Sequence, residues 1–321
     1  MISYFAKPLL LFAANSARHL ASCVVLVIVL SLMACAGPST PPPDFPASEP
    51  HTRGAVKLLS EVYLTHAEGL QLEPWDPLAV RVVTEFGAVF VAQGGAVTPR
   101  EWMFPNESAV ATFQSKLAIS ASVSSPPIEL QFVALAAFQA AVHEAAGRGL
   151  TISPNGPGSA RRSYHETLKL WRSRLDPGLA HWVKAGKLTR TDADRLLALS
   201  PRQQVTAALE LEAHGAWLST GFDKSILQSV AAPGTSQHLS LLAIDVSEHA
   251  NSAVREVLAR HGWYQTVYSD LPHFTFVGVS EDKLPSLGLV RRLNSGRVFW
   301  VVNAPRLRGE VEPDVMEQCA F

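Results

Sequence analysis

Hydrophobic and polar positions along the chain predict helices in its middle part and strands towards its C-terminal end. Residues 130–149 carry apolar side chains at helical spacing and finish on glycines, which is typical of a helix and its stop. Residues 251–262 predict a second helix that begins at an Asn cap and ends at a Gly. Further helices are expected over residues 162–175, 191–200 and 201–220.

Short apolar runs predict strands, and a run rich in Pro, Asn and Gly over residues 152–160 predicts a loop. Residues 82–98 predict two strands around a Gly-Gly pair, and residues 298–303 predict one more strand that covers a sheet edge. The remaining strands are expected at residues 239–246, 263–270 and 273–279. Because helices come first and strands later, the order predicts an α+β fold and not a repeating βαβ sheet.

The N-terminal stretch predicts a lipoprotein signal peptide over residues 1–34. Basic residues precede an apolar run, residues 23–34, that is shorter than the ~20 residues of a bilayer span. The run ends in Leu-Met-Ala-Cys, which resembles the bacterial lipobox, so we expect Cys35 to be lipidated; the alternative is an ordinary thiol beside a generic cleavage site. The proline-rich residues 35–52 then predict an extended tether.

Export by this route predicts a protein anchored to a membrane on its extracytoplasmic, periplasmic side. Ala follows Cys35, which indicates the outer membrane if the cell is Gram-negative. Cys23 belongs to the predicted signal peptide, so beyond Cys35 only Cys319 remains in the mature chain, and any metal site has to use His, Asp or Glu.

The charge balance excludes a general nucleic-acid binder. The chain has 27 Lys+Arg and 28 Asp+Glu, and cleavage before Cys35 would remove Lys7 and Arg18, leaving 25 − 28 = −3. A mildly acidic chain lacks the basic surface that nucleic acid requires. Since no phosphate-binding glycine motif occurs, we expect no nucleotide cofactor.

Candidate chemistry is concentrated in two stretches about thirty residues apart. The first is PGTSQHLSLLAID, which contains His238 and Asp245, and the second is SDLPHFTF, which contains His273. Two histidines and a carboxylate at strand edges can supply three zinc ligands and leave the fourth position for water. Spacing alone leaves a second interpretation open, because a buried His is more often a hydrogen-bonded core residue.

These stretches resemble the motifs of the zinc D-Ala-D-Ala carboxypeptidase family, which includes the D,D-dipeptidases of vancomycin resistance. The first stretch is similar to S-x-H-x-x-G-x-A-x-D and the second to E-x-x-H, while SARRSY at residues 159–164 is similar to S-G-Y-R-S-Y. The resemblance runs from about Glu129 to Gly278. Three positions depart from the motifs, with Leu241 in place of Gly, Pro272 in place of Trp and Asp270 in place of Glu.

The resemblance implies a small antiparallel sheet that carries a zinc site and is flanked by helices. It implies that Zn²⁺ is bound by His238, Asp245 and His273. Arg162 would steady the oxyanion and contact substrate, and Asp270 would act as general base. Ser236 would either bind substrate or orient His238.

The activity that the resemblance implies is a zinc metallopeptidase that removes the C-terminal D-alanine from peptidoglycan stem peptides. One alternative is a catalytically silent peptidoglycan-binding lipoprotein, and another is an endopeptidase or D,D-dipeptidase on the same fold. We divide the rest of the sequence into three parts. Residues 53–127 are the N-terminal part of the globular unit, residues 128–280 are a zinc peptidase core, and residues 281–321 are a C-terminal extension without an assigned function.

Overall fold

The computed structural model describes residues 59–73, 75–121 and 127–304, all within the compact unit Arg53–Phe321. The predicted signal peptide, Cys35 with its tether, and Cys319 lie outside the described residues. Within the described part of the chain, no helix combines the length and the apolar character that crossing a membrane requires.

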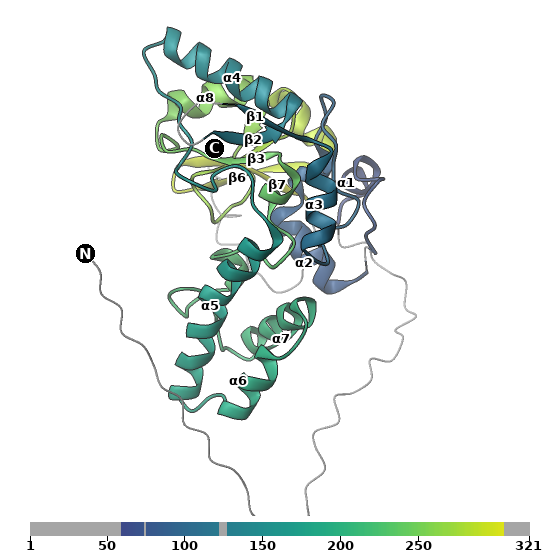
Figure 1. Ribbon diagram of the computed structural model, residues 1–321, viewed down its shortest axis with the longest axis vertical. Helices are drawn as coiled ribbons and strands as arrows, with labels where there is room; N and C mark the ends of the chain where they lie inside the picture. Colours follow the sequence, from purple (N-terminus) through teal and green to yellow (C-terminus); the bar gives the residue numbers. More distant parts are fainter. Residues whose placement is uncertain (1–58, 74, 122–126, 305–321) are drawn as a thin grey trace, which may run out of the picture. The chain divides into compact units, whose positions relative to one another are not determined.

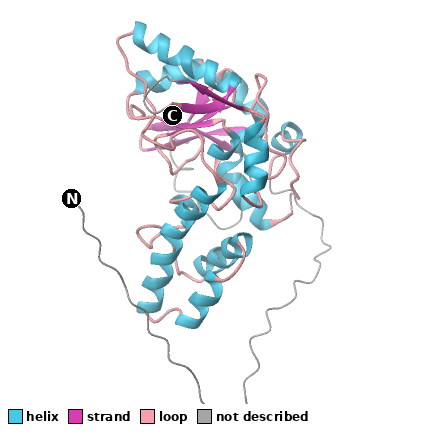
Figure 2. Ribbon diagram, in the orientation of Figure 1, coloured by secondary structure: helices cyan, strands magenta, loops and turns pink. Residues whose placement is uncertain are grey.

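The fold is α+β, as predicted, and its strands form small antiparallel sheets (Figure 2). One three-stranded sheet carries two of the predicted metal ligands, Asp245 and His273. Its strand order is β3-β5-β4, where β3 is Ala243–Asp245, β5 is His273–Phe276 and β4 is Trp263–Tyr264. Two further antiparallel pairs are β1 with β2, Ala118–Ala121 with Ile128–Gln131, and β6 with β7, Leu289–Asn294 with Arg297–Val302.

Helices flank these strands, with α4 and α8 next to one another and close to β1, β2 and β3 (Figure 1). Phe138 of α4 packs edge-on against Trp263 of β4, with ring centroids 5.9 Å apart. The helices are α1 Glu61–His66, α2 Pro77–Phe86, α3 Glu107–Ser115, α4 Phe132–Gly147, α5 Tyr164–Lys184, α6 Arg190–Leu197, α7 Pro201–Ala213 and α8 Ser252–Arg260. Short 3₁₀ helices are η1 Gly87–Val91, η2 Ile226–Gln228, η3 Gln237–Ser240 and η4 Glu281–Leu287.

One large hydrophobic cluster joins these elements. It contains buried side chains from Leu59 through Val302 and includes residues of α1, α2, α4 to α8 and all three strand groups, while Val110 of α3 belongs to a smaller cluster. The segments before and after the predicted peptidase core therefore bury apolar surface together with it, which is the main favourable term in folding.

Local sequence explains where the helices next to the site begin. The Ser163 hydroxyl accepts a hydrogen bond from the Glu166 amide, and the Glu166 carboxylate accepts one from the Ser163 amide. This capping box starts α5 directly after Arg162. The predicted Asn cap of α8 is confirmed, because the Asn251 side chain accepts from the Ala253 amide.

The prediction of two strands over residues 82–98 is wrong. Residues 77–86 form α2, which Asp76 caps and Pro77 begins, and residues 87–91 form η1. Val82 and Val83 are buried in α2, and Val89 and Val91 are buried in η1, so packing of these helical elements outweighs the modest β preference of branched side chains.

Several other elements differ from prediction in extent; only Trp263–Tyr264 of the strand predicted at residues 263–270 form β4, and the helix predicted at residues 201–220 ends at Ala213. Strand β3 covers only residues 243–245 of the predicted 239–246, because residues 237–240 form η3. Helix α5 continues through Pro177 to Lys184 instead of ending near residue 175. The predicted strand at residues 298–303 is confirmed as β7; it pairs with β6, and its Trp300 amide also donates to the Gln265 carbonyl beside β4.

Leu241 ends η3 in the left-handed conformation, with φ 61° and ψ 25°. This position corresponds to the motif glycine, which has no Cβ to oppose positive φ. A left-handed non-glycine residue costs ~1–2 kcal/mol, yet the Leu241 side chain is fully buried and contributes to packing.

We expect Leu241→Gly to destabilise the protein even though it restores the motif residue. Losing a buried Leu side chain costs ~2–5 kcal/mol, and relief of the backbone returns ~1–2 kcal/mol, so the net loss should be about 2 kcal/mol, within a range of about 0–4 kcal/mol. Denaturant unfolding of the two proteins measures this difference. A variant more stable than the parent would show that backbone strain at residue 241 outweighs the packing of its side chain.

Candidate metal centre

The register of the sheet places two of the predicted ligands opposite one another. Strands β3 and β5 are antiparallel, and Asp245 is paired with His273 across the ladder. Directly opposed residues on neighbouring strands have their Cβ atoms about 5 Å apart, so the carboxylate and the imidazole meet. The short helix η3 precedes β3 and brings His238 to the same end of the sheet.

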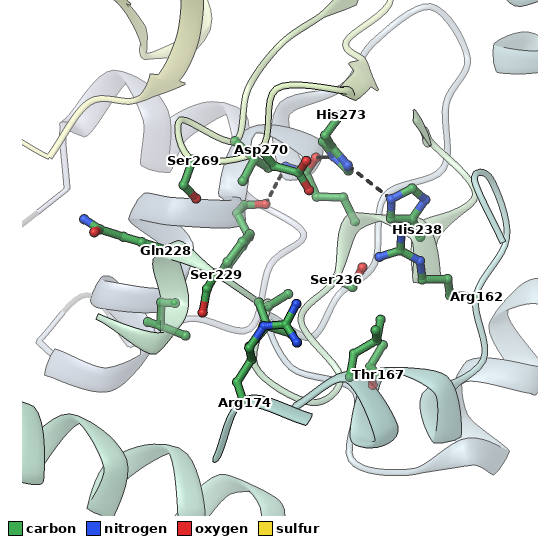
Figure 3. Close-up of a pocket in the computed structure, with 17 residues that line it drawn as sticks. Arg162, Thr167, Arg174, Gln228, Ser229, Ser236, His238, Ser269, Asp270 and His273 are labelled. Carbon is green, nitrogen blue, oxygen red and sulfur yellow. Dashed lines mark hydrogen bonds between the residues drawn. The ribbon is translucent and has the colours of Figure 1, made fainter. Parts of the chain in front are cut away.

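The three side chains converge on one point. The distance from His238 Nε2 to His273 Nδ1 is 3.1 Å, from His273 Nδ1 to Asp245 Oδ1 3.3 Å, and from His238 Nε2 to Asp245 Oδ1 3.4 Å. Figure 3 shows the two imidazoles facing one another across the first of these distances. Both histidines are buried.

Hydrogen bonds on the outer nitrogens determine which nitrogen of each ring carries the proton. The Gln237 amide nitrogen donates to the Phe86 carbonyl at 2.8 Å, so its oxygen faces His273 Nε2 at 2.7 Å and accepts from it. On the other ring, His238 Nδ1 donates to the Ala160 carbonyl at 2.7 Å. The inner nitrogens of both rings therefore present lone pairs.

The electrostatics agree with this assignment. Burial lowers the pKa of His238 to about 4, although the charge of Asp245 opposes the shift, so the ring is neutral at pH 7. Burial alone would raise the pKa of Asp245, but contacts with His238 and His273 outweigh it and hold the pKa well below its usual range. At pH 7 the cluster therefore combines a neutral His238 ring with an ionised Asp245 carboxylate.

These residues fit a zinc ion. Ligand bonds of about 2.0–2.1 Å in tetrahedral geometry place donor atoms about 3.3 Å apart, which matches the three measured separations. Two imidazoles and one carboxylate are also a donor set that catalytic zinc sites use, with a fourth position left open. Within residues 59–73, 75–121 and 127–304, this is the one cluster of His, Cys, Asp or Glu side chains arranged to hold a metal ion.

Residues 152–160 form a loop, as predicted. This loop pairs with the outer edge of β3, the edge that does not face β5. Its Ser159 carbonyl accepts from the Asp245 amide at 2.7 Å, and its Asn155 amide donates to the Asp245 carbonyl at 2.8 Å. The same loop supplies the Ala160 carbonyl that fixes His238. One loop thus positions two of the three metal-binding candidates.

Arg162 lies directly against this cluster. Its Nη2 donates to Asp245 Oδ2 at 2.8 Å, the carboxylate oxygen that faces away from the histidines, and its Nε donates to the Gly158 carbonyl at 3.2 Å. The guanidinium therefore orients the candidate ligand, as outer partners of metal sites commonly do. Arg162 also lines the pocket in front of the cluster, so its predicted contact with substrate stays a prediction.

A pocket of about 250 Å³ opens in front of the two histidines (Figure 3). Ser236 and Asp270 line it together with His238 and His273. The Ser236 side chain makes no cap hydrogen bond to η3, and His238 Nδ1 is held by the Ala160 carbonyl, so both roles predicted for Ser236 stay predictions.

Asp270 stands at the start of the turn that leads into β5. Its amide donates to the Val267 carbonyl at 3.0 Å, and its carbonyl accepts from the His273 amide at 3.3 Å. Burial raises the pKa of the Asp270 carboxyl, with His273 the strongest opposing charge. A raised pKa makes the carboxylate a better proton acceptor, which suits a general base.

Buried glutamines hold the site together, and sequence reasoning missed all of them. Gln237 fixes His273, and its oxygen also accepts from the Thr275 hydroxyl. Gln114 donates to the carbonyls of Arg162 and Leu239, which ties the arginine segment to the histidine segment. Gln131 donates to the Ser240 carbonyl, again next to η3.

Several residues close in sequence to the candidate ligands have structural roles. Glu248 accepts hydrogen bonds from the amide and hydroxyl of Ser153 and so fastens the site loop, without contacting a candidate ligand. Trp263, Tyr264 and Phe274 are buried in the core and do not line a groove beside the metal centre.

Comparison with known proteins found similar chains among solved structures. No protein-family model and no curated protein sequence matches the chain. It is similar to a mutant of the vancomycin-resistance D,D-pentapeptidase VanY from a VanB-type cassette, in complex with Zn(II), at 16% identity and TM-score 0.30, covering 50% of this chain and 79% of that one. It is also similar to the LD-carboxypeptidase LdcB at 15% identity and TM-score 0.28, covering 53% and 68%.

We expect Gln237→Leu to weaken zinc binding by ~10–100-fold, because loss of an outer partner frees the ligand ring and its tautomer. Competition with a chromophoric chelator measures this affinity. Gln204→Leu is the matched control, since Gln204 is a buried glutamine of α7 that donates to the Leu197 and Leu199 carbonyls. Equal zinc affinity of the Gln237 variant and the parent would contradict the orienting role.

Proposed function

We propose that the chain is a zinc-dependent peptidase of the cell envelope that removes the C-terminal D-alanine from peptidoglycan stem peptides. The observation that carries the proposal is the convergence of His238, Asp245 and His273 on one metal-sized point at the end of a pocket. The motif resemblance around these residues supports the choice of substrate.

Zinc bound at this cluster would supply Lewis-acid chemistry, which polarises a carbonyl and acidifies water. The Asp270 carboxylate would accept the proton of the attacking water and deliver it to the nitrogen of the departing D-alanine. The bond that breaks is the terminal amide, and water supplies both the new carboxylate oxygen and the protons of the new amine.

The remaining pocket residues would hold the peptide during this reaction. Arg162 keeps Asp245 in place through one nitrogen and has further N–H groups for the developing oxyanion. The Ser236 hydroxyl faces the same pocket and can bond to the peptide backbone.

The predicted export signal supports a location where peptidoglycan is accessible. Lipidation at Cys35 would anchor the chain to a membrane, with the outer membrane as the destination in a Gram-negative cell. About 15 residues of proline-rich tether at ~3.1 Å each would let the catalytic unit work within about 45 Å of its anchor.

The direct test is release of D-alanine by the full-length zinc-loaded protein from a pentapeptide that ends in D-Ala-D-Ala. We expect release that a chelator stops and that added zinc restores. His238→Ala should lose both zinc and activity, because it removes one of three candidate ligands. His143→Ala, at an exposed position of α4, should retain both.

Failure of the folded, zinc-loaded protein to release anything would contradict the peptidase. Binding of the same peptide without hydrolysis would then favour the silent peptidoglycan-binding alternative. Release of the dipeptide D-Ala-D-Ala, or cleavage of a cross-link, would indicate the dipeptidase or endopeptidase.

We expect Asp270→Asn to lower kcat by ~10²–10⁴-fold, because the amide cannot accept a proton. Zinc content should remain at the parent level, since Asp270 is outside the ligand cluster. Asp282→Asn, an exposed acidic position in η4, serves as the control and should leave kcat unchanged. An Asp270 variant with full kcat would show that another group takes the proton.

A further inference from the structure

One face of α5 forms a wall of the pocket. Thr167, Leu170 and Arg174 follow one another at spacings of three and four residues, which places them on the same side of the helix. All three line the pocket in front of the metal centre. Figure 3 shows the guanidinium of Arg174 directed into this space, with Thr167, Ser236 and Arg162 on the side towards His238.

Arg174 has no counter-charge among the described residues. Its Nε is shielded from solvent and has no hydrogen-bond partner, and its one hydrogen bond runs from Nη1 to the Ser173 hydroxyl at 2.9 Å. The other arginines nearby differ in this respect. Arg162 is paired with Asp245 at 2.8 Å, and Arg172 of the same helix with Asp176 at 2.6 Å.

Asp270, the carboxylate among the described residues that line the pocket, forms no ion pair with Arg174. The charges that act on Asp270 most strongly belong to His273, Asp245 and Arg162. The other polar lining residues, including Gln228, Ser229 and Ser269, are neutral. The lining therefore carries two guanidinium groups against one carboxylate, and the cation of Arg174 is uncompensated.

A guanidinium that is partly shielded from solvent and has an N–H group without a hydrogen bond destabilises the folded protein, unless a hydrogen-bond acceptor pairs with that group. A carboxylate suits it best, because two parallel N–H donors match two carboxylate oxygens. The pocket volume of about 250 Å³ is below the ~300–1,000 Å³ typical of drug-sized ligands, so it suits the end of a peptide.

We propose that Arg174 binds the terminal carboxylate of the substrate peptide and thereby restricts cleavage to the last residue. This inference rests on the proposed function and deepens it, because it selects the carboxypeptidase over the endopeptidase. Arg174 is a binding and specificity residue, while Arg162 remains with Asp245 at the metal centre.

The test compares two substrates that differ only at their ends, N-acyl-Lys-D-Ala-D-Ala and its C-terminal amide. Full-length zinc-loaded protein should prefer the free acid by ~10–100-fold in kcat/KM, the range expected when a charged hydrogen bond is lost. Arg174→Met, which keeps the apolar stem, should raise KM for the acid by a similar factor, leave kcat within about threefold and abolish the preference.

Two further variants show whether an effect of substituting Arg174 comes from its charge, from its planar geometry or from a general disturbance of α5. Arg174→Lys keeps the charge but not the planar fork, so it should retain only part of the preference. Arg172→Met is the matched control on the same helix, and it should behave like the parent, because Arg172 is paired with Asp176 and does not line the pocket.

Calorimetric binding of the same two peptides to the zinc-loaded protein distinguishes failure of this inference from failure of the proposed function. Preferential binding of the acid that Arg174→Met abolishes, without any turnover, would support the role of Arg174 and contradict the peptidase. Turnover with an acid preference that survives in Arg174→Met, or equal use of acid and amide by the parent, would overturn the role of Arg174. Absence of binding to either peptide would overturn it as well.

Discussion

The structure depends on one buried contact among two imidazoles and a carboxylate. Two imidazole nitrogens and a carboxylate oxygen point their electron pairs at one another, with separations between 3.1 and 3.4 Å. Each outer nitrogen is bonded so that its ring cannot turn away, through Ala160 for His238 and Gln237 for His273. The surrounding polypeptide thus supplies the geometry, and a bound metal ion would accept the electron pairs of the three side chains.

The rest of the fold can be understood as support for this contact. The antiparallel pairing of β3 and β5 sets the carboxylate opposite one histidine, and a left-handed Leu241 lets η3 lead directly into β3 with the other histidine in place. The capping box of α5 then begins a long helix next to Arg162 and turns one of its faces to the pocket. Under the proposed function, metal binding, proton transfer and selection of the peptide end would fall to different walls of one small cavity.

The sequence predicted the α+β class, α4 and the capped α8, because periodic apolar positions and cap residues are local signals. The resemblance to the zinc peptidase motifs also predicted that His238, Asp245 and His273 lie together, as they do in the structure. The prediction from sequence failed at α2, where a valine-rich run suggested strands although the buried face has helical period. The buried glutamines and Arg174 could not be predicted, because a glutamine has no motif and the importance of Arg174 depends on which face of α5 meets the pocket.

The most direct test of the central claim is zinc X-ray absorption on the full-length protein after metal loading. The account predicts one zinc per chain with only nitrogen and oxygen neighbours at about 2.0–2.1 Å, two of them imidazoles. Substoichiometric zinc would contradict it. So would a sulfur neighbour near 2.3 Å, because that distance belongs to a cysteine ligand and would place the metal outside the cluster of His238, Asp245 and His273.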